Sequence, residues 1–425
     1  MPAPPTLPPD IRTPVPGPGS IALAERLTRV ESRNVTCTEP TPPLFWARAA
    51  GANVWDVDDN RYVDLAAGFG VAAAGHAHPR VVAAVREQAE TLMHAMGDVH
   101  PPAVKVELLE VLAGLFPGGA PSRAVLGSSG SDAVETALKT AQLASGRAGV
   151  VAFEGAYHGL TYGALDATWR PHFRDPFAAR LAGTTSFARF GDVDDVKRAA
   201  HACPQQVGAV LVEPVQGRGG ERIPTPGFLS ALRERCDREG WLLICDEVYT
   251  GFGRTGRWFA CEHEDVVPDL LCVGKGLTSG MPLSACMGRA EIMDAWPPSG
   301  GEALHTWTFL GHPPGCAAAL ASIAVLREEK LVEHAEELGG VALAHLRERL
   351  GGRAGVTDVR GLGLLLGVEL HEPSDTAAAC AEALRRGVIV IPSGDAGQVI
   401  SLTPPLGIER DALLAALDVV AECIP

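Results

Sequence analysis

The stretch LLICDEVYTGFGRTG, from Leu242 to Gly256, decides how this chain is built. An apolar run ends in two adjacent carboxylates, Asp246 and Glu247, and a glycine-rich loop follows. A run that is apolar on both faces is typical of a strand buried in a parallel sheet. A carboxylate at the end of such a strand is costly unless a cation faces it. We therefore expect a positively charged group close to Asp246.

Apolar runs and helix-like segments alternate on both sides of this stretch. Because helices separate the strands, the pattern predicts an α/β fold with a largely parallel sheet that helices cover on both faces. Ligands bind such sheets at the carboxyl ends of the strands. The other runs are SRAVLGSS (122–129), GVVAFEGAYHG (149–159), VGAVLVEPVQG (207–217) and PDLLCVGKG (268–276). The helix-like segments are 131–145, 192–203 and 225–240.

The flanking regions predict further structure. Residues 51–85 predict a hairpin, a glycine-rich loop and a helix. After residue 315 we expect one long helix through about Leu350, and then a small α+β unit with a helix near 376–387. The expected division is an N-terminal arm and hairpin segment (1–75), a large domain (76–318) and a small C-terminal domain (319–425).

Residues 1–20 are rich in proline and have neither a basic start nor an apolar core, so they do not resemble a signal peptide. They predict an extended or disordered arm. An arm that docks on a partner subunit would have the same composition.

Composition excludes several classes of function. The chain of 425 residues has a formal net charge of −15 and a pI near 5.3, which argues against binding to nucleic acid or to an anionic membrane. The longest apolar run, 316–326, is too short to cross a bilayer. Ten cysteines without a CxxC pair indicate buried thiols in a reducing compartment. We expect a cytoplasmic protein without a metal, and interpret His76 and His78 as loop histidines near a helix start.

Polar residues at the ends of the strands predict a binding site. Ser129, Gly130 and Ser131 follow one strand and open a helix, where backbone N–H groups form an anion site. An ordinary Ser/Asp helix cap explains this pattern as well. Tyr157 and His158 lie in a loop between glycines, where the tyrosine ring either faces a planar ligand or belongs to the core.

The decisive residue is Lys275, which follows another apolar run and is flanked by glycines. An ion pair between Asp246 and Lys275 would explain both residues. A desolvated lysine, however, has a lowered pKa and is a nucleophilic amine. Glu213 and Gln216 end a third strand, either as loop-fixing hydrogen-bonding groups or as substrate contacts. An anion site, an aromatic ring, a strand-end carboxylate and this lysine together match pyridoxal phosphate (PLP), with Asp246 on the ring nitrogen.

At this point the chain resembles the class III aminotransferases of fold type I, the group that includes ornithine, acetylornithine and 4-aminobutyrate aminotransferases. The matching motifs are SGSDAVETALK, YHG, EPVQG, LLICDEVYTGFGRTG, VGKGL and HTWTFLGHP, and the resemblance extends from about Pro43 to Pro405. It implies a large domain with a mostly parallel seven-stranded sheet. It also implies a smaller α+β domain built from the N-terminal segment and the C-terminal third, and a homodimer with shared active sites.

The resemblance implies a role for each matching residue. Lys275 would hold PLP as a Schiff base and then move a proton between Cα and C4′, while Asp246 would pair with the pyridine nitrogen. Val248 would lie against the ring face opposite Tyr157. The remaining cofactor contacts would come from Ser129, Gly130, Ser131, His158, Glu213, Gln216 and, reaching the phosphate bound by the other subunit, Thr308.

Substrate contacts are expected at four positions. The resemblance implies that Arg360 binds a substrate carboxylate, and that Glu213 neutralises it when the substrate is an amine. Leu160 stands where relatives carry an arginine for a distal carboxylate, and Trp307 stands where they usually carry a small residue. These two differences favour an amine donor whose far end is uncharged or bulky.

Alternatives remain at the level of the reaction and of the substrate contacts. The expected reaction is ping-pong transfer of an amino group from a primary amine or ω-amino donor to a 2-keto acid. A PLP-dependent amino-acid racemase or aminomutase of the same fold would use Lys275 for the same proton shift. A non-catalytic binding protein on this scaffold would be expected to lack Lys275 or Asp246. Three arginines are candidates to replace the missing one: Arg170, Arg174 and Arg218. Each is interpreted instead as an ordinary solvated or structural arginine.

Overall fold

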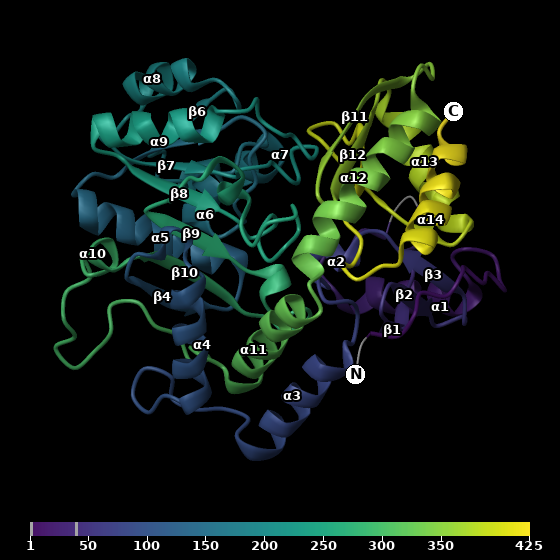
Figure 1. The fold of residues 1–425 in the computed structure, drawn as a ribbon, viewed down its shortest axis with the longest axis horizontal. Coiled ribbons are helices and arrows are strands. Elements are labelled where there is room, and N and C mark those ends of the chain that lie inside the picture. The colour runs from purple at the N-terminus through teal and green to yellow at the C-terminus, as the bar shows by residue number, and fades with distance from the viewer. Residues whose placement is uncertain (1–2, 39–40) are drawn as a thin grey trace.

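The computed structural model describes residues 3–38 and 41–425, and its largest element is a seven-stranded sheet (Figure 1). The strand order is β4-β10-β9-β8-β7-β5-β6; β10 is antiparallel to both neighbours and the other pairs are parallel. The expected mostly parallel seven-stranded sheet is therefore confirmed. The bounds are β4 (Ser122–Gly127), β5 (Gly149–Phe153), β6 (Thr185–Ala188), β7 (Val207–Val212), β8 (Leu242–Asp246), β9 (Leu270–Val273) and β10 (Ser284–Arg289).

Helices cover both faces of this sheet (Figure 1). Successive residues of one strand belong to different cores: Val210 packs with Leu232 on one face, and Leu211 packs with Val134 on the other. This alternation is why the strands are apolar throughout. The covering helices include the three that the sequence predicts, α5 (Gly130–Ser145), α8 (Val193–Ala202) and α9 (Phe228–Glu239), together with α4 (Ala103–Leu115) and α10 (Ala290–Met293). Two short helices, α6 (Tyr162–Asp166) and α7 (Pro171–Arg174), follow β5; α6 packs on α5, and α7 packs on α6.

Two four-stranded sheets lie at the other end of the molecule (Figure 1). In the first, β1-β2-β3-β13, the parallel pairing of β13 with β3 joins the N-terminal hairpin to the C-terminal third. The second, β11-β12-β15-β14, is antiparallel. The strands are β1 (Trp46–Ala50), β2 (Asn53–Asp56), β3 (Arg61–Asp64), β11 (Val356–Leu362), β12 (Leu365–Leu370), β13 (Val388–Ile389), β14 (Ile391–Ser393) and β15 (Val399–Leu402). The remaining α-helices are α1 (Pro18–Val30), α2 (Ala67–Gly70), α3 (Pro79–Thr91), α11 (Pro313–Glu328), α12 (Leu331–Leu350), α13 (Pro373–Arg385) and α14 (Arg410–Cys423).

The prediction of a single helix after residue 315 is wrong, because the chain forms two helices, α11 and α12, with a break between them. Lys330 at the break has a φ of 51°, in the left-handed region that a right-handed helix cannot include. The two helices serve different parts of the molecule: α11 packs on α3 and α4, whereas α12 packs on β11 and α14. No glycine or proline stands at the break, so the apolar pattern continues through it.

Residues 3–17 of the N-terminal arm form no helix, and a bridge at Asp10 ties the arm to the hairpin, so its disordered form is wrong for the described residues. Its backbone pairs with the hairpin, since Asp10 exchanges two hydrogen bonds of 2.9 Å with Arg61. The N–H of Leu7 donates to Asn53 Oδ1 at 2.7 Å. The proline-rich composition fits this arrangement, because an extended chain needs few backbone donors.

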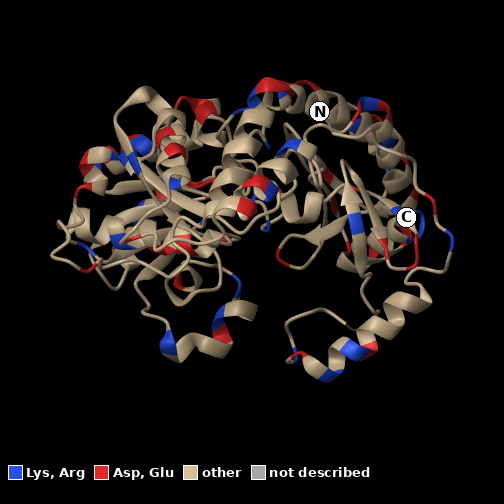
Figure 2. Ribbon diagram, turned by 90° about the horizontal axis from the view of Figure 1, so that it is seen from below, with Lys and Arg blue, Asp and Glu red and all other residues tan. Residues whose placement is uncertain are grey.

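Figure 2 shows that Lys and Arg residues are interspersed with Asp and Glu residues along the ribbon. Many of them pair, for example Arg233 with Asp269 at 2.7 Å. Among the residues the structure describes, no helix is both long and apolar enough to cross a bilayer.

The two carboxylates that end β8 have separate tasks, because successive side chains of a strand point to opposite faces. Glu247 is fully buried and holds the following loop: its carboxylate accepts hydrogen bonds from Thr250 Oγ1 and from the N–H groups of Ala260 and Cys261, the latter two at 2.8 Å. Burial raises the pKa of Glu247. Asp246 therefore faces the other side of the strand end, where the candidate site lies.

Replacing Glu247 by alanine should destabilise the fold, since it leaves two buried backbone N–H groups without an acceptor. We expect Glu247→Ala to lower the free energy of unfolding by about 2–4 kcal/mol. Urea denaturation followed by circular dichroism measures this change. The exposed Glu234→Ala is the control, with an expected change within about 0.5 kcal/mol. Equal urea midpoints for the two variants would contradict the role given to Glu247.

Candidate active site

The candidate site lies at the carboxyl ends of β8 and β9, which are parallel neighbours in the large sheet. Asp246 ends β8 and is paired in register with Cys272 of β9. Lys275 follows β9 after Gly274, with a φ of 41° that a non-glycine residue adopts only under strain. The topology therefore brings the two residues to one edge of the sheet, as the sequence predicts.

The side chain that faces Asp246 is that of His158, and not that of Lys275. His158 Nδ1 and Asp246 Oδ2 are joined by a hydrogen bond of 2.7 Å, and both side chains are buried. The second carboxylate oxygen of Asp246 accepts from the N–H of Val248 at 3.1 Å. Within the described parts of the chain Lys275 forms no ion pair, so the alternative of a direct Asp246–Lys275 pair is wrong.

Lys275 instead lies against an aromatic ring. Its Nζ is 4.0 Å from the ring centroid of Tyr249, whose hydroxyl is 3.3 Å from Thr403 Oγ1. Burial lowers the pKa of Lys275 to about 8; the positive charges of Arg218 and Arg254 act in the same direction, and the negative charges of Asp246 and Glu213 oppose it. The sequence reasoning did not single out Tyr249, although it stands in the same strand-end motif as Asp246.

The opposite wall of the site is the start of α5. Ser129 caps this helix, because its Oγ accepts from the N–H of Asp132 at 3.2 Å, and the Asp132 carboxylate accepts in return from the Ser129 N–H at 3.1 Å. The N–H groups of Gly130 and Ser131 belong to the first turn and have no acceptor within the helix. The helix cap and the anion site, which the sequence left as alternatives, are thus present together.

Val248 connects these walls. A Cβ built on Gly130 would lie 2.8 Å from Val248 Cγ1, and one built on Gly274 would lie 3.4 Å from the same atom. A side chain at Gly130 would therefore displace Val248. The start of α5, the end of β8 and the turn before Lys275 are close-packed around one valine.

Tyr157, Glu213 and Gln216 belong to the loops beside Asp246. The carboxylate of Glu213 accepts from the N–H groups of Tyr157 at 3.0 Å and Gly217 at 3.2 Å, and burial raises its pKa to about 7. Gln216 Nε2 donates to the carbonyl of Glu154 at 2.8 Å. Both side chains fix loops, which is one of the two alternatives predicted for them.

The structure does not bring Glu213 and Arg360 into contact. Arg360 Nη1 instead pairs with Glu369 at 2.6 Å and with Asp358 at 2.8 Å. Its Nε donates to the carbonyls of Gly220 at 3.0 Å and of Glu221 at 3.1 Å. The guanidinium of Arg360 is therefore bonded to carboxylates and backbone carbonyls, as in a structural arginine.

Leu160, Trp307 and Thr308 lie at the periphery. Leu160 is half-exposed, and its N–H donates to Ser131 Oγ at 3.1 Å. Trp307 packs edge-on against His305 with ring centroids 5.4 Å apart. Thr308 is exposed and its hydroxyl has no hydrogen-bond partner within the described residues.

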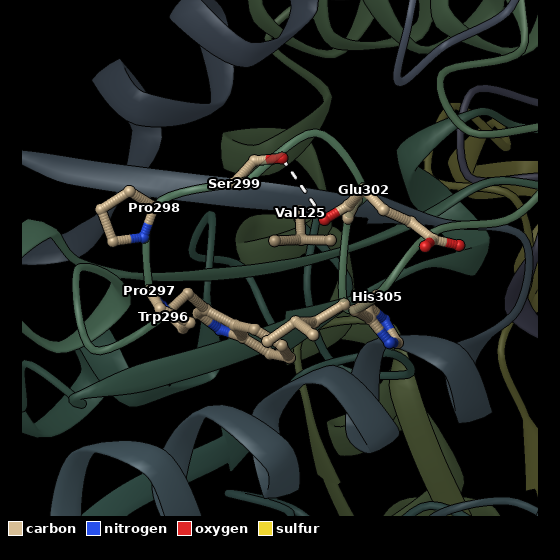
Figure 3. A pocket seen from close by; sticks show the side chains of 10 residues that line it. Val125, Trp296, Pro297, Pro298, Ser299, Glu302 and His305 are labelled. Carbon is tan, nitrogen blue, oxygen red and sulfur yellow. Dashed lines mark hydrogen bonds between the residues drawn. The ribbon is translucent and has the colours of Figure 1, made fainter.

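The segment before Thr308 arches over a cavity of about 330 Å³ (Figure 3). It is lined by residues 296–300 and 302–305 and by Val125, and Ser299 Oγ donates to the carbonyl of Glu302 at 3.3 Å. His305 anchors the segment to α5 through Thr136 at 3.0 Å. None of the residues clustered around Lys275 lines this cavity, so it is separate from the candidate site.

The histidines of the GHAHP segment have structural partners. His76 Nε2 is 2.8 Å from Asp64 Oδ2, and His78 caps α3 by accepting from the N–H of Arg80. Among the described residues there is no group of three metal-binding side chains.

The cluster around Lys275 fits PLP. Two of its buried polar atoms, His158 Nε2 and Gln216 Oε1, have no hydrogen-bond partner within the described residues. Gly130 and Ser131 offer N–H groups for a phosphate, Asp246 offers a carboxylate for a ring nitrogen, and Lys275 offers an amine of lowered pKa. Each group that the cofactor needs is therefore present on one side of the sheet edge.

Comparisons with known proteins identify the family of the chain. The family model of class III aminotransferases matches residues 35–424. Acetylornithine aminotransferase of Methanopyrus kandleri is 42% identical over 382 residues, which cover 90% of this chain and 94% of the relative. The 4-aminobutyrate aminotransferase of Mycobacterium tuberculosis is 40% identical over 438 residues, covering 96% of each chain.

A solved structure extends the likeness to three dimensions. The ornithine aminotransferase of Toxoplasma gondii, described with PLP at its active site, has a TM-score of 0.86 and 32% identity over 95% of this chain and 93% of its own. An amine transaminase of an uncultivated Pseudomonas species, described in its PLP-bound form, has a TM-score of 0.85 at 30% identity, over 93% of this chain and 99% of its own. The chain therefore belongs to the class III aminotransferases and is an enzyme that transfers amino groups with pyridoxal phosphate.

Proposed function

We propose that this aminotransferase moves an amino group from a primary amine or ω-amino donor with an uncharged or bulky far end to a 2-keto acid, in two half-reactions at Lys275. The observation that carries the proposal is the Lys275 amine, with a pKa near 8, at the same sheet edge as a carboxylate that a histidine already holds. An amine of this kind is nucleophilic near neutral pH.

The residues of the site divide the work. When bound, PLP supplies an aldehyde that condenses with amines and a ring that accepts electrons. Lys275 Nζ would accept the proton from the substrate Cα and deliver it to C4′, the cofactor carbon on the other side of the amino nitrogen. Asp246 would keep a proton on the ring nitrogen, and its bond to His158 fixes the carboxylate in position.

The walls of the site would orient the reaction. Val248 would contact one face of the ring and Tyr157 the other, which favours a single geometry for the bond that loses its proton. The N–H groups of Gly130 and Ser131 would bind the phosphate at the start of α5. Ser129, as the cap of that helix, would act by positioning these donors.

Leu160 supports a donor without a distal charge. It places an apolar, half-exposed side chain beside the start of α5, bonded through its backbone to Ser131. A donor carboxylate near Leu160 would lose its hydration without gaining a cation. The relatives named for acetylornithine and 4-aminobutyrate act on donors that carry a carboxylate, so this chain would differ from them in donor choice.

A homodimer is the second part of the proposal. Apolar side chains are exposed on two neighbouring segments, which His94 and Phe309 join with ring centroids 5.2 Å apart. The exposed residues are Met93, Met96, Val99, Leu304 and Phe309. A patch of this kind marks a protein interface. Thr308 lies within it and would reach the phosphate bound by a second copy.

An amine-donor panel tests the donor class. With pyruvate and 2-oxoglutarate as acceptors, we expect uncharged primary amines to give a higher kcat/KM than ornithine or 4-aminobutyrate. Leu160→Arg should raise kcat/KM for 4-aminobutyrate by about tenfold, because it adds a charge-assisted contact. Leu143→Arg, at another exposed leucine, is the control. A large preference of the unmodified enzyme for ornithine would be incompatible with the role of Leu160.

The lowered pKa of Lys275 predicts how cofactor capture depends on pH. Because the neutral amine is the reactive form, the rate at which cofactor-free protein captures PLP should rise about tenfold per pH unit below pH 8 and level off above it. The visible absorbance band of the bound cofactor reports the rate. Lys275→Ala should show no such band, and Lys197→Ala should behave as the unmodified protein. A capture rate that still increases above pH 10 would show that Lys275 has the pKa of an ordinary lysine.

The proposed dimer predicts a cofactor defect at a distance from Lys275. Thr308→Ala should raise the dissociation constant of PLP by about tenfold while the molecule stays dimeric, because one hydrogen bond to a charged group is lost. Thr306→Ala, whose hydroxyl bonds Asp98 in the same chain, is the control. Phe309→Asp should yield monomers in analytical ultracentrifugation. A monomeric unmodified enzyme that retains PLP would rule out the shared site.

A further inference from the structure

The loop after β7 presents an arginine whose charge has no anionic partner. The guanidinium of Arg218 lies over the rings of Tyr157 and Phe173, at 5.1 and 5.4 Å from their centroids. Its side chain is exposed and forms no hydrogen bond or ion pair within the described residues. Its carbonyl, by contrast, accepts from Arg170 at 3.1 Å and from the N–H of Gly394 at 3.1 Å. The backbone is anchored while the guanidinium remains free.

The neighbouring arginines are already paired. Arg170 Nε lies 3.7 Å from Asp395, and Arg222 Nη2 lies 3.6 Å from the same carboxylate. Arg218 therefore stands beside a pair of arginines that already share one carboxylate, so positive charge is in excess here. Such an excess of positive charge attracts an anion from solution.

Arg360 cannot fill this role without breaking its present bonds. Two carboxylates and two backbone carbonyls occupy its guanidinium. The carbonyls belong to Gly220 and Glu221, so Arg360 fastens the Arg218 loop to β11. Its contacts are those of a support for the loop.

Arg218 also acts electrostatically on Lys275 and on Tyr157. Its positive charge contributes to the lowered pKa of Lys275 and opposes the effect of burial on the pKa of Tyr157. The Tyr157 ring is the proposed wall for the cofactor, and Arg218 lies directly over it. Gly217, the residue before Arg218, packs on the Tyr249 ring, since a Cβ built on it would lie 2.5 Å from Tyr249 Cδ1, and Lys275 Nζ lies against the same ring. A carboxylate held by Arg218 would therefore belong to a substrate bound beside Lys275.

We propose that Arg218 binds the carboxylate of the acidic substrate, the 2-keto acid and the amino acid formed from it, while Arg360 acts as the support of the Arg218 loop. The inference rests on the proposed function and names the residue that recognises one of its two substrate classes. The planar guanidinium would form a paired, charge-assisted contact with the carboxylate.

This assignment also explains how one site accepts two kinds of substrate. An arginine buried without a partner is costly, and a neutralising carboxylate would then be needed for the uncharged amine. Arg218 is exposed to water and stacks on two aromatic rings, so it is stable without an anion. When the donor has no carboxylate, the guanidinium stays on the rings.

The test compares two single-charge changes in the same loop, Arg218→Gln and Arg222→Gln, in the full-length enzyme carrying PLP. For Arg218→Gln we expect the dissociation constants of pyruvate and of unreactive propanoate to rise about 10- to 100-fold. Measured well above pH 8, where the Lys275 amine is neutral with or without the Arg218 charge, the half-reaction with an uncharged primary amine should change less than about twofold. Arg222→Gln should leave both dissociation constants within about twofold. Arg218→Lys should raise them by less than Arg218→Gln does, because lysine keeps the positive charge but lacks the planar pair of N–H donors.

A second measurement does not depend on turnover. Removing the charge of Arg218 should move the pH midpoint of PLP capture by cofactor-free protein upward, because a cation that lowers the Lys275 pKa is gone. Arg222→Gln should not move it. A residue that merely supports the fold would change the urea midpoint instead.

Three results would overturn the inference: unchanged propanoate binding in Arg218→Gln, an equal loss in Arg222→Gln, or loss of carboxylate binding in a folded Arg360→Gln enzyme with none in Arg218→Gln. The donor class is decided separately. If the unmodified enzyme transferred nothing from uncharged amines, the proposed function would fail, while propanoate binding would still decide the role of Arg218.

Discussion

The pairing of β8 with β9 is the constraint on which the site depends. Parallel neighbours carry Asp246 and Lys275 to one edge of the sheet, and the bond from His158 then satisfies Asp246. The amine of Lys275 lies against Tyr249 and forms no ion pair within the described residues. Its burial lowers its pKa, and the negative charges of Asp246 and Glu213 offset this effect only in part. A direct ion pair would have raised the pKa of the amine further and reduced its nucleophilic character.

Much of the large sheet was predictable, because its five central and edge runs are apolar on both faces and end at glycine, proline or charge. Strands β6 and β10 were not predicted as strands. The segment TSFA of β6 is short, and SACMGR of β10 mixes small, apolar and charged residues. The break between α11 and α12 was also missed, since Lys330 adopts a left-handed conformation that the packing of the two helices on different partners imposes. These are tertiary effects that local pattern does not record.

In the site, the residues that carry chemistry were predictable from strand ends, and their partners were not. Lys275, Asp246 and the start of α5 follow from the alternation of apolar runs with glycine-flanked polar residues. The bond between His158 and Asp246 joins loops that are far apart in sequence. The engagement of Arg360 depends on the register of β11 with β12, which sets Asp358 opposite Glu369 and places both carboxylates beside the guanidinium. Only the structure therefore separates the occupied arginine from the free one.

The parallel pairing of β3 with β13 has a consequence for how the molecule is made. Residues 61–64 pair with β2 on one edge, but their second partner strand comes only at 388–389, near the end of the chain. The strands of the large sheet, by contrast, all lie between residues 122 and 289. The ribosome synthesises the N-terminus first, so the large sheet can fold before residues 388–389 are made. Until then one edge of β3 has no partner strand, which leaves its backbone groups exposed. The nascent enzyme thus passes through a stage that chaperones would have reason to shield.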